Sequence, residues 1–212
     1  MGKTILFDLD GTLTDSGEGI INCASLALSH FGLPIPDRQT MRVFVGPPLH
    51  DTFVKFGVPD GKVEEAVAVY RSRYVTVGKF ENTPYPGIPA RLESLKAHGH
   101  KLLVATSKPE TLSIEIMEHF DIAKYFDLIC GASLDRSRST KEDVIAYLLE
   151  HSGTAENMVM VGDTVFDVLG AAAHGIPTIG VSWGYGTVED MKNAGASAIA
   201  YSTQELLELL NQ

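Results

Sequence analysis

TILFDLDGTLTD, residues 4–15, decides the predicted fold of this 212-residue chain. Its first four residues form a short apolar run that stops abruptly at acids, as a buried strand does where its C-terminal end meets solvent. Asp8 and Asp10 flank Leu9 at that point, and Gly11 follows. Taken alone, the two acids could simply form a turn that closes a strand. Their meaning therefore depends on what the rest of the chain brings to the same place.

Short apolar runs recur downstream and alternate with segments of helical spacing. The expected strands after residues 4–7 are 101–105, 126–130, 158–161 and 178–181. The expected helices between and after them are 89–98, 110–120, 141–151, 165–174 and 188–194. Strands that alternate with helices of this length indicate an α/β fold, with a Rossmann-like parallel sheet covered on both faces.

One connection is much longer than the others. Residues 8–100 separate the first expected strand from the second, whereas a crossover between parallel strands needs only about a dozen residues. Four segments within this stretch have helical patterns and are separated by Gly and Pro turns: 16–31, 37–45, 49–56 and 61–77. We therefore expect residues 16–80 to form an inserted four-helix cap domain, and residues 1–15 and 81–212 to form the α/β core.

Reactive side chains cluster at the ends of the expected strands, where open parallel sheets bind ligands. Besides Asp8 and Asp10 after the first strand, the candidates are Thr106 and Ser107 after the second, Asp163 and Asp167 after the fourth, and Lys141 at the start of the helix before it. Four converging carboxylates would repel one another without a cation. A hard divalent cation resolves the conflict, and oxygen ligands beside a phosphate favour Mg²⁺.

Composition excludes several other classes of protein. The chain carries 17 Lys and Arg against 27 Asp and Glu, a formal net charge of −10, and has no basic cluster, so a nucleic-acid polymer is not an expected partner. No run approaches the roughly 20 apolar residues of a membrane span, and no signal peptide is evident. Cys23 and Cys130 lie far apart without metal-ligand spacing, which favours a reducing, cytoplasmic location.

Together these segments resemble the haloacid dehalogenase (HAD) superfamily of phosphatases, specifically the members with a helical cap after the first motif. The resemblance covers essentially the whole chain. The family's first motif matches residues 8–12, its hydroxyl matches Thr106 or alternatively Ser107, its lysine matches Lys141, and its paired acids match Asp163 and Asp167. The resemblance implies a HAD-like fold and a phosphoric monoester hydrolase.

The implied mechanism uses Asp8 as the nucleophile that forms an aspartyl-phosphate. Asp10 would protonate the leaving oxygen and then deprotonate the attacking water. By the same resemblance, Mg²⁺ would be held by Asp8, the main-chain carbonyl of Asp10 and Asp163, while Asp167 would orient metal-bound water. Thr106, Ser107 and Lys141 would bind the phosphoryl oxygens.

A helical cap implies an enclosed site, which favours small soluble phosphate esters as substrates. Residues 42–48, RVFVGPP, give a stiff turn in the cap that could carry specificity. Arg42 could meet a carboxylate or a second phosphate of the substrate, or it could be a solvated helix charge. Lys79, near the return to the core, is equally undecided. The residues do not determine the natural substrate, and a monomer and a homodimer are both open.

The alternative functions are a phosphomutase of the β-phosphoglucomutase type and a non-catalytic module that binds a phosphorylated metabolite. The mutase pattern has a histidine, a lysine and an arginine where this chain has Ile20, Val45 and Leu49. Dehalogenases and phosphonatases are disfavoured because they lack an aspartate at the position of Asp10. The segments 105–109, ATSKP, and 184–186, GYG, look like the phosphoglycolate-phosphatase and nucleotidase group. We expect residues 184–186 to be a turn rather than a phosphate-binding loop.

Overall fold

A computed structural model of the chain describes residues 2–135, 137–153 and 156–212. The chain forms two compact units, one made of Met1–Thr14 with Pro84–Gln212 and the other of Asp15–Thr83. The sequence placed the insertion at residues 16–80. Glu81 lies with the inserted unit because its carboxylate binds Arg73 in that unit, at 2.6 and 2.7 Å.

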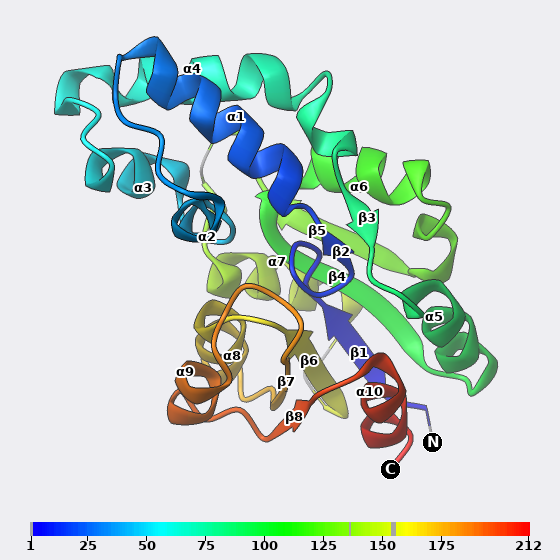
Figure 1. The fold of residues 1–212 in the computed structure, drawn as a ribbon. Coiled ribbons are helices and arrows are strands. Elements are labelled where there is room, and N and C mark those ends of the chain that lie inside the picture. The colour runs from blue at the N-terminus through cyan, green and yellow to red at the C-terminus, as the bar shows by residue number, and fades with distance from the viewer. Residues whose placement is uncertain (1, 136, 154–155) are drawn as a thin grey trace. The chain divides into compact units, whose positions relative to one another are not determined.

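The larger unit is built on a parallel sheet, which has six strands among the described residues (Figure 1). Their order across the sheet is β5-β4-β1-β6-β7-β8, with β1 near the middle. The strands are β1 Thr4–Phe7, β4 Lys101–Pro109, β5 Leu128–Ala132, β6 Met158–Gly162, β7 Thr178–Val181 and β8 Ala198–Ala200. The expected α/β fold with a Rossmann-like parallel sheet is confirmed, and β8 is an additional strand that the sequence did not reveal.

Helices cover both faces of this sheet, as Figure 1 shows. They are α5 Ile88–Ala97, α6 Glu110–His119, the short 3₁₀ helix η4 Ala123–Tyr125, α7 Lys141–Ser152, α8 Val165–Ala172, α9 Val188–Asn193 and α10 Thr203–Leu210. α5 to α9 lie at the positions expected from the sequence, whereas α10 was not expected. None of the helices in the described residues is long and apolar enough to cross a membrane.

The alternation of side chains along each strand divides the core of this unit in two. Ile5 and Phe7 belong to the cluster that contains residues of α5 and α10, whereas Leu6 belongs to the cluster that contains residues of α7 and α8. Because successive strand residues point to opposite faces, a strand buried on both faces is continuously apolar. After this apolar stretch, polar side chains therefore begin only once β1 ends at Phe7, with Asp8 at the carboxyl edge of the sheet.

The inserted unit, residues 15–83, is entirely described and contains four α-helices. Its elements are α1 Gly17–His30, α2 Arg38–Met41, η1 Arg42–Phe44, α3 Leu49–Lys55, η2 Asp60–Lys62, α4 Val63–Tyr74 and η3 Gly78–Phe80. Phe44 and Phe53 pack with ring centroids 5.2 Å apart in its interior. The junctions with the larger unit, β2 Thr14–Asp15 and β3 Thr83–Pro84, pair as a two-stranded sheet.

Candidate active site

Asp8 directly continues the central strand. Its backbone N–H donates to the carbonyl oxygen of Val161 at 2.9 Å, so the pairing of β1 with β6 extends one residue beyond the strand. The residue is 9% exposed. A charged carboxyl in such a place is costly unless other groups compensate it. Those groups come from the ends of β4 and β6 and from the beginnings of α7 and α8.

Asp163, at the end of β6, is completely buried and is held from two sides. Its Oδ1 accepts from the hydroxyl of Thr12 at 3.2 Å, and its Oδ2 accepts from the backbone N–H of Tyr185 at 2.7 Å. A Cβ at Gly11 or at Gly184 would lie 2.2 Å from Asp163 Oδ2. Only glycine therefore lets the two loops approach so closely, and residues 184–186 form a bend that encloses this carboxylate.

Asp167 lies in the first turn of α8 and is also fully buried. Its Oδ2 accepts from the backbone N–H of Thr164 at 3.0 Å and from the Thr164 hydroxyl at 2.9 Å. These contacts satisfy donors that a helix N-terminus leaves open. A side chain at position 162 would collide with Asp167, because a Cβ there would lie 2.2 Å from its Cγ. The Oδ1 of Asp167 is left to face the other charged groups.

Lys141 joins two of these carboxylates. Its Nζ lies 2.8 Å from Asp8 Oδ1 and 2.7 Å from Asp167 Oδ1, and it donates to the carbonyl oxygen of Ala105 at 2.9 Å. Thr140 caps α7 just before it, by accepting from the backbone N–H of Asp143 at 3.1 Å. The first turn of α7 thus fixes the base of a lysine that is 5% exposed.

Burial and repulsion dominate the electrostatics of this group. Burial raises the pKa of Asp8 to about 6, although Lys141 and a hydrogen bond from Thr106 act in the opposite direction. Burial and the charges of Asp167 and Asp8 hold the pKa of Asp163 well above its usual range. Burial alone would lower the pKa of Lys141, but Asp167 and Asp8 outweigh it and raise that pKa. Lys141 therefore stays charged, and its one ammonium contacts two of the three buried carboxyl groups.

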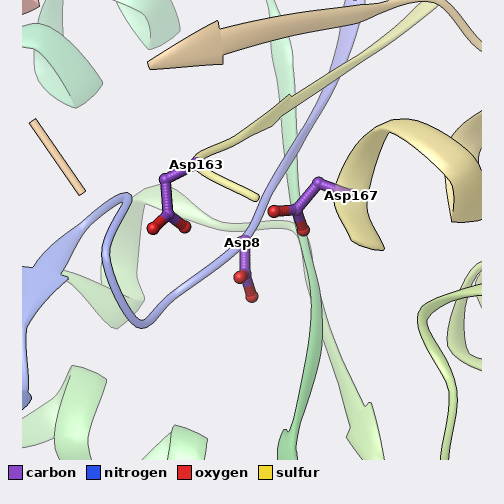
Figure 2. A group of neighbouring side chains, drawn as sticks. All are labelled: Asp8, Asp163 and Asp167. Carbon is purple, nitrogen blue, oxygen red and sulfur yellow. The ribbon is translucent and has the colours of Figure 1, made fainter. Parts of the chain in front are cut away.

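This excess of negative charge fits a hard divalent cation. Asp8, Asp163 and Asp167 each offer one carboxylate oxygen, and these atoms all lie within 4.8 Å of one another. Figure 2 shows the three side chains coming from the end of β1, the end of β6 and the first turn of α8. Asp8 Oδ1 and Asp167 Oδ1 are buried and lack a partner in hydrogen-bond geometry, although both lie at ion-pair distance from Lys141. Carboxylate oxygens of this kind suit Mg²⁺.

Asp10 takes a different partner. Its side chain is outside the group of three, and both its oxygens contact Nζ of Lys108, at 2.7 and 3.0 Å. Lys108 follows Thr106 and Ser107 in β4. Thr106 is 1% exposed and Ser107 is half-buried. The sequence analysis interpreted residues 105–109 only as a group resemblance and did not predict the contact of Lys108 with Asp10.

Arg42 and Lys79 both belong to the inserted unit. Arg42 begins η1 and is half-buried, whereas Lys79 is buried, with its Nζ 4.9 Å from the ring centroid of Phe80. Their roles toward a substrate therefore stay predictions.

Comparison with known proteins identifies the family. The family model described as "Haloacid dehalogenase-like hydrolase" matches residues 5–181. The chain belongs to this family. Membership confirms the resemblance to HAD phosphatases and establishes the chain as an enzyme of the hydrolase class.

Individual relatives of this HAD hydrolase carry different names. A "5'-nucleotidase" of Pseudomonas aeruginosa is 43% identical over 89% of this chain and 86% of its own length. The "Tyrosine-protein kinase PtkA" of Mycobacterium tuberculosis is 42% identical over 98% of this chain and 72% of its own length. The crystal structure of "a predicted phosphatase" from Clostridium acetobutylicum is 43% identical, with a TM-score of 0.94, and the match covers 100% of this chain and 99% of that one.

Proposed function

We propose that this HAD hydrolase is a Mg²⁺-dependent phosphatase that hydrolyses a small phosphate monoester through an aspartyl-phosphate on Asp8. The observation that carries this proposal is the buried Asp8 carboxyl, 2.8 Å from the ammonium of Lys141 and grouped with Asp163 and Asp167. A nucleophile needs an oxygen that is held in place and a neighbouring positive charge that attracts an anionic substrate.

In the first step a carboxylate oxygen of Asp8 attacks phosphorus in line. A P–O bond to Asp8 forms while the P–O bond to the leaving oxygen breaks, and that oxygen receives a proton from the carboxyl group of Asp10. Lys141 and Thr106 hold the phosphoryl oxygens during the transfer, because an ammonium and a hydroxyl both donate to oxygens that gain charge.

In the second step water replaces Asp8. Asp10, now a carboxylate, takes a proton from the water as its oxygen attacks phosphorus, and the bond between phosphorus and Asp8 breaks. Inorganic phosphate leaves, and both aspartates return to their starting protonation states. One difficult displacement is thereby divided into two easier ones.

Asp8, Asp163 and the main-chain carbonyl of Asp10 are the groups that we propose as Mg²⁺ ligands, with Asp167 beside them. When bound, Mg²⁺ would neutralise charge between the Asp8 carboxylate and the anionic phosphate. The charges support this assignment: Asp8, Asp163 and Asp167 have only Lys141 as a cationic partner within the contacts described above, which leaves two negative charges for one divalent cation.

The substrate class is the finer part of the proposal. The group resemblance of residues 105–109 and the nucleotidase relative both support a nucleoside monophosphate or phosphoglycolate. The kinase relative makes a protein tyrosine a second acceptor to test, because an aspartyl-phosphate can in principle pass its phosphoryl group to a hydroxyl other than water. A cytoplasmic location and a monomeric or homodimeric state also stay predictions.

Replacing Asp8 tests the proposed function. We expect the wild-type protein to hydrolyse 4-nitrophenyl phosphate with Mg²⁺ and not with a chelator, and Asp8→Asn to reduce turnover to background. Asp51→Asn, an exposed aspartate on α3, is the matched control and should turn over normally. Turnover by Asp8→Asn at the wild-type rate would show that Asp8 is not the nucleophile.

A substrate panel tests the finer proposal. The panel contains nucleoside monophosphates, phosphoglycolate, sugar phosphates and phosphotyrosine, ranked by kcat/KM. A mutase would instead give an isomerised sugar phosphate and depend on a bisphosphate activator. A binding module would bind one of these compounds in the presence of Mg²⁺ without releasing phosphate.

A further inference from the structure

Lys108 is a second buried lysine near the proposed nucleophile, and its ammonium contacts the carboxylate of Asp10. Nζ lies 2.7 Å from Oδ2 and 3.0 Å from Oδ1 of Asp10. The two side chains are only 6% and 13% exposed. Lys141, by contrast, contacts Asp8 and Asp167. The two lysines thus contact different carboxylates: Lys108 contacts Asp10, and Lys141 contacts Asp8 and Asp167.

Burying both members of this pair has an energetic cost. Two charges leave water, and their attraction compensates the loss only when the contact geometry is good. Here one ammonium touches both oxygens of one carboxylate, so rotation of the Asp10 side chain would break at least one contact. The pair is therefore a strong restraint on the direction of Asp10.

The backbone of β4 directs Lys108 toward Asp10. The pairing of β4 with β5 shifts register between Ala105 and Pro109, so the strand is irregular at residues 106–108. Within this irregular part the backbone N–H of Lys108 donates to Thr106 Oγ1 at 3.3 Å. The carbonyl oxygen of Lys108 lies so close to Gly131 that a Cβ there would be 2.6 Å away. These contacts fix the base of the lysine.

We propose that Lys108 is a positioning residue that holds the carboxyl group of Asp10 where it exchanges a proton with the leaving oxygen and with water. This inference rests on the proposed phosphatase function. It differs from a phosphate-binding role, because the group that Lys108 contacts is Asp10. If Lys108 positions Asp10, the loss of kcat on replacing Lys108 should depend on the leaving group. A poor leaving group needs a well-placed proton donor, and a good leaving group does not.

The kinetic test compares Lys108→Met with Lys108→Arg on two substrates. For glycerol phosphate, whose alkoxide leaves poorly, we expect Lys108→Met to lower kcat by about 100-fold. For 4-nitrophenyl phosphate we expect a loss under about tenfold, and for both substrates KM should change little. Lys108→Arg should recover much of the lost kcat, because guanidinium can also contact both oxygens of a carboxylate.

Two controls separate positioning from other effects. Lys101→Met removes an exposed lysine at the start of the same strand and should leave kcat and KM for both substrates unchanged. In the Asp10→Asn background, Lys108→Met should cause little further loss, because residues that act as a unit are not additive. Equal losses for the two substrates, a loss confined to KM, or full additivity with Asp10→Asn would overturn the proposal.

A structural test does not depend on turnover. In a crystal structure of Lys108→Met we expect the Asp10 carboxyl group to leave its wild-type position or to occupy more than one. An unchanged, single Asp10 conformer would overturn the positioning role even if the substrate is unknown. Failure of the phosphatase function would appear separately, as absent turnover by the wild type or as undiminished turnover by Asp8→Asn.

Discussion

At the residue scale, glycines determine how Asp163 is held. The carboxylate is enclosed by Gly11 and Gly184 and accepts hydrogen bonds from Thr12 and Tyr185. Groups that orient a metal ligand commonly affect metal affinity by about 10- to 100-fold when they are changed. The glycines should therefore influence Mg²⁺ binding although they offer no side-chain ligand.

Gly184→Ala tests this expectation. Its Cβ would lie 2.2 Å from Asp163 Oδ2, so the carboxylate or the loop must move. We expect the Mg²⁺ dissociation constant, measured by calorimetry, to rise by about tenfold or more. Gly61→Ala is the control, because nothing lies within 4 Å of a Cβ there, and it should bind Mg²⁺ normally. Unchanged Mg²⁺ affinity in Gly184→Ala would show that Asp163 tolerates displacement.

The sequence analysis predicted the residues of the candidate active site but did not predict some of their contacts. Asp8 and Asp163 were identifiable because each directly follows an apolar strand, and Asp167 because it lies only four residues after Asp163. Parallel strands end at one edge of a sheet, so these side chains were expected to lie together. The contact of Lys108 with Asp10 could not be predicted, because it depends on an irregularity in β4 that has no sequence signature. The close approach of Gly184 to Asp163 likewise follows only from the folded loops.

At the element scale, an ion pair connects two segments of the inserted unit: Arg73 belongs to α4, and Glu81 follows η3. The guanidinium contacts both carboxylate oxygens of Glu81, and Asn22 of α1 donates to Oε2 at 3.2 Å. Hydrogen bonding to Arg73 lowers the pKa of Glu81. The sequence analysis assigned Glu81 to the α/β core, because a pairing between α4 and a later loop residue leaves no periodic pattern.

Glu81→Gln should destabilise the protein in a pH-dependent way. The side chains are 28% and 25% exposed, so we expect a loss of only about 1 kcal/mol in the free energy of unfolding at pH 7. The folded pKa of Glu81 lies below its unfolded value, so this contribution is complete above about pH 4.5 and is lost as pH falls through the folded pKa.

Urea unfolding at several pH values measures this difference. The difference in the free energy of unfolding between wild type and Glu81→Gln should narrow as the pH falls through the folded pKa of Glu81, where the glutamate also becomes neutral. Glu65→Gln is the comparison: its carboxylate is 43% exposed, and we expect a smaller loss of stability than for Glu81→Gln, because solvent screens the charge. A gap that stays constant with pH would mean that the Glu81 charge does not contribute.

Element prediction failed mainly for the last part of the chain. β8 has only three residues, Ala198–Ala200, which is too short for an alternating pattern to be recognised. α10 follows it at once, and Ser202 caps the helix by accepting from the Glu205 backbone N–H at 3.1 Å. The sequence analysis missed this local signal, Ser202 three residues before Glu205, and burial of Leu206 and Leu210 against the sheet makes the segment part of the core.

At the scale of the whole molecule, the buried acidic group of Asp8, Asp163 and Asp167 lowers stability. Three carboxyl groups are buried near one ammonium that contacts only two of them, and burial together with neighbouring charge raises the pKa of Asp163 and of Asp8. Without a cation, the charged forms oppose folding. Under the proposed function, Mg²⁺ bound to this group would stabilise the protein, because a ligand that binds only the folded state adds to the free energy of unfolding.

We therefore expect Asp163→Asn to be more stable than wild type without metal and less stable than wild type with Mg²⁺. Asparagine has nearly the same shape, its carbonyl can still accept from the Tyr185 backbone N–H, and it removes one buried charge. Burial and the charges of Asp167 and Asp8 raise the pKa of Asp163, so its charged form opposes folding, and we expect the metal-free variant to be more stable than wild type. At 100 times the dissociation constant, Mg²⁺ should stabilise wild type by about 2.7 kcal/mol and the variant by little.

Urea unfolding in chelator and in Mg²⁺ measures both quantities. Asp60→Asn, which changes an exposed aspartate, is the control and should follow wild type in each condition. If Asp163→Asn lowers metal-free stability, its hydrogen bonds outweigh the repulsion, and if it keeps the full Mg²⁺ effect, Asp163 is not a ligand.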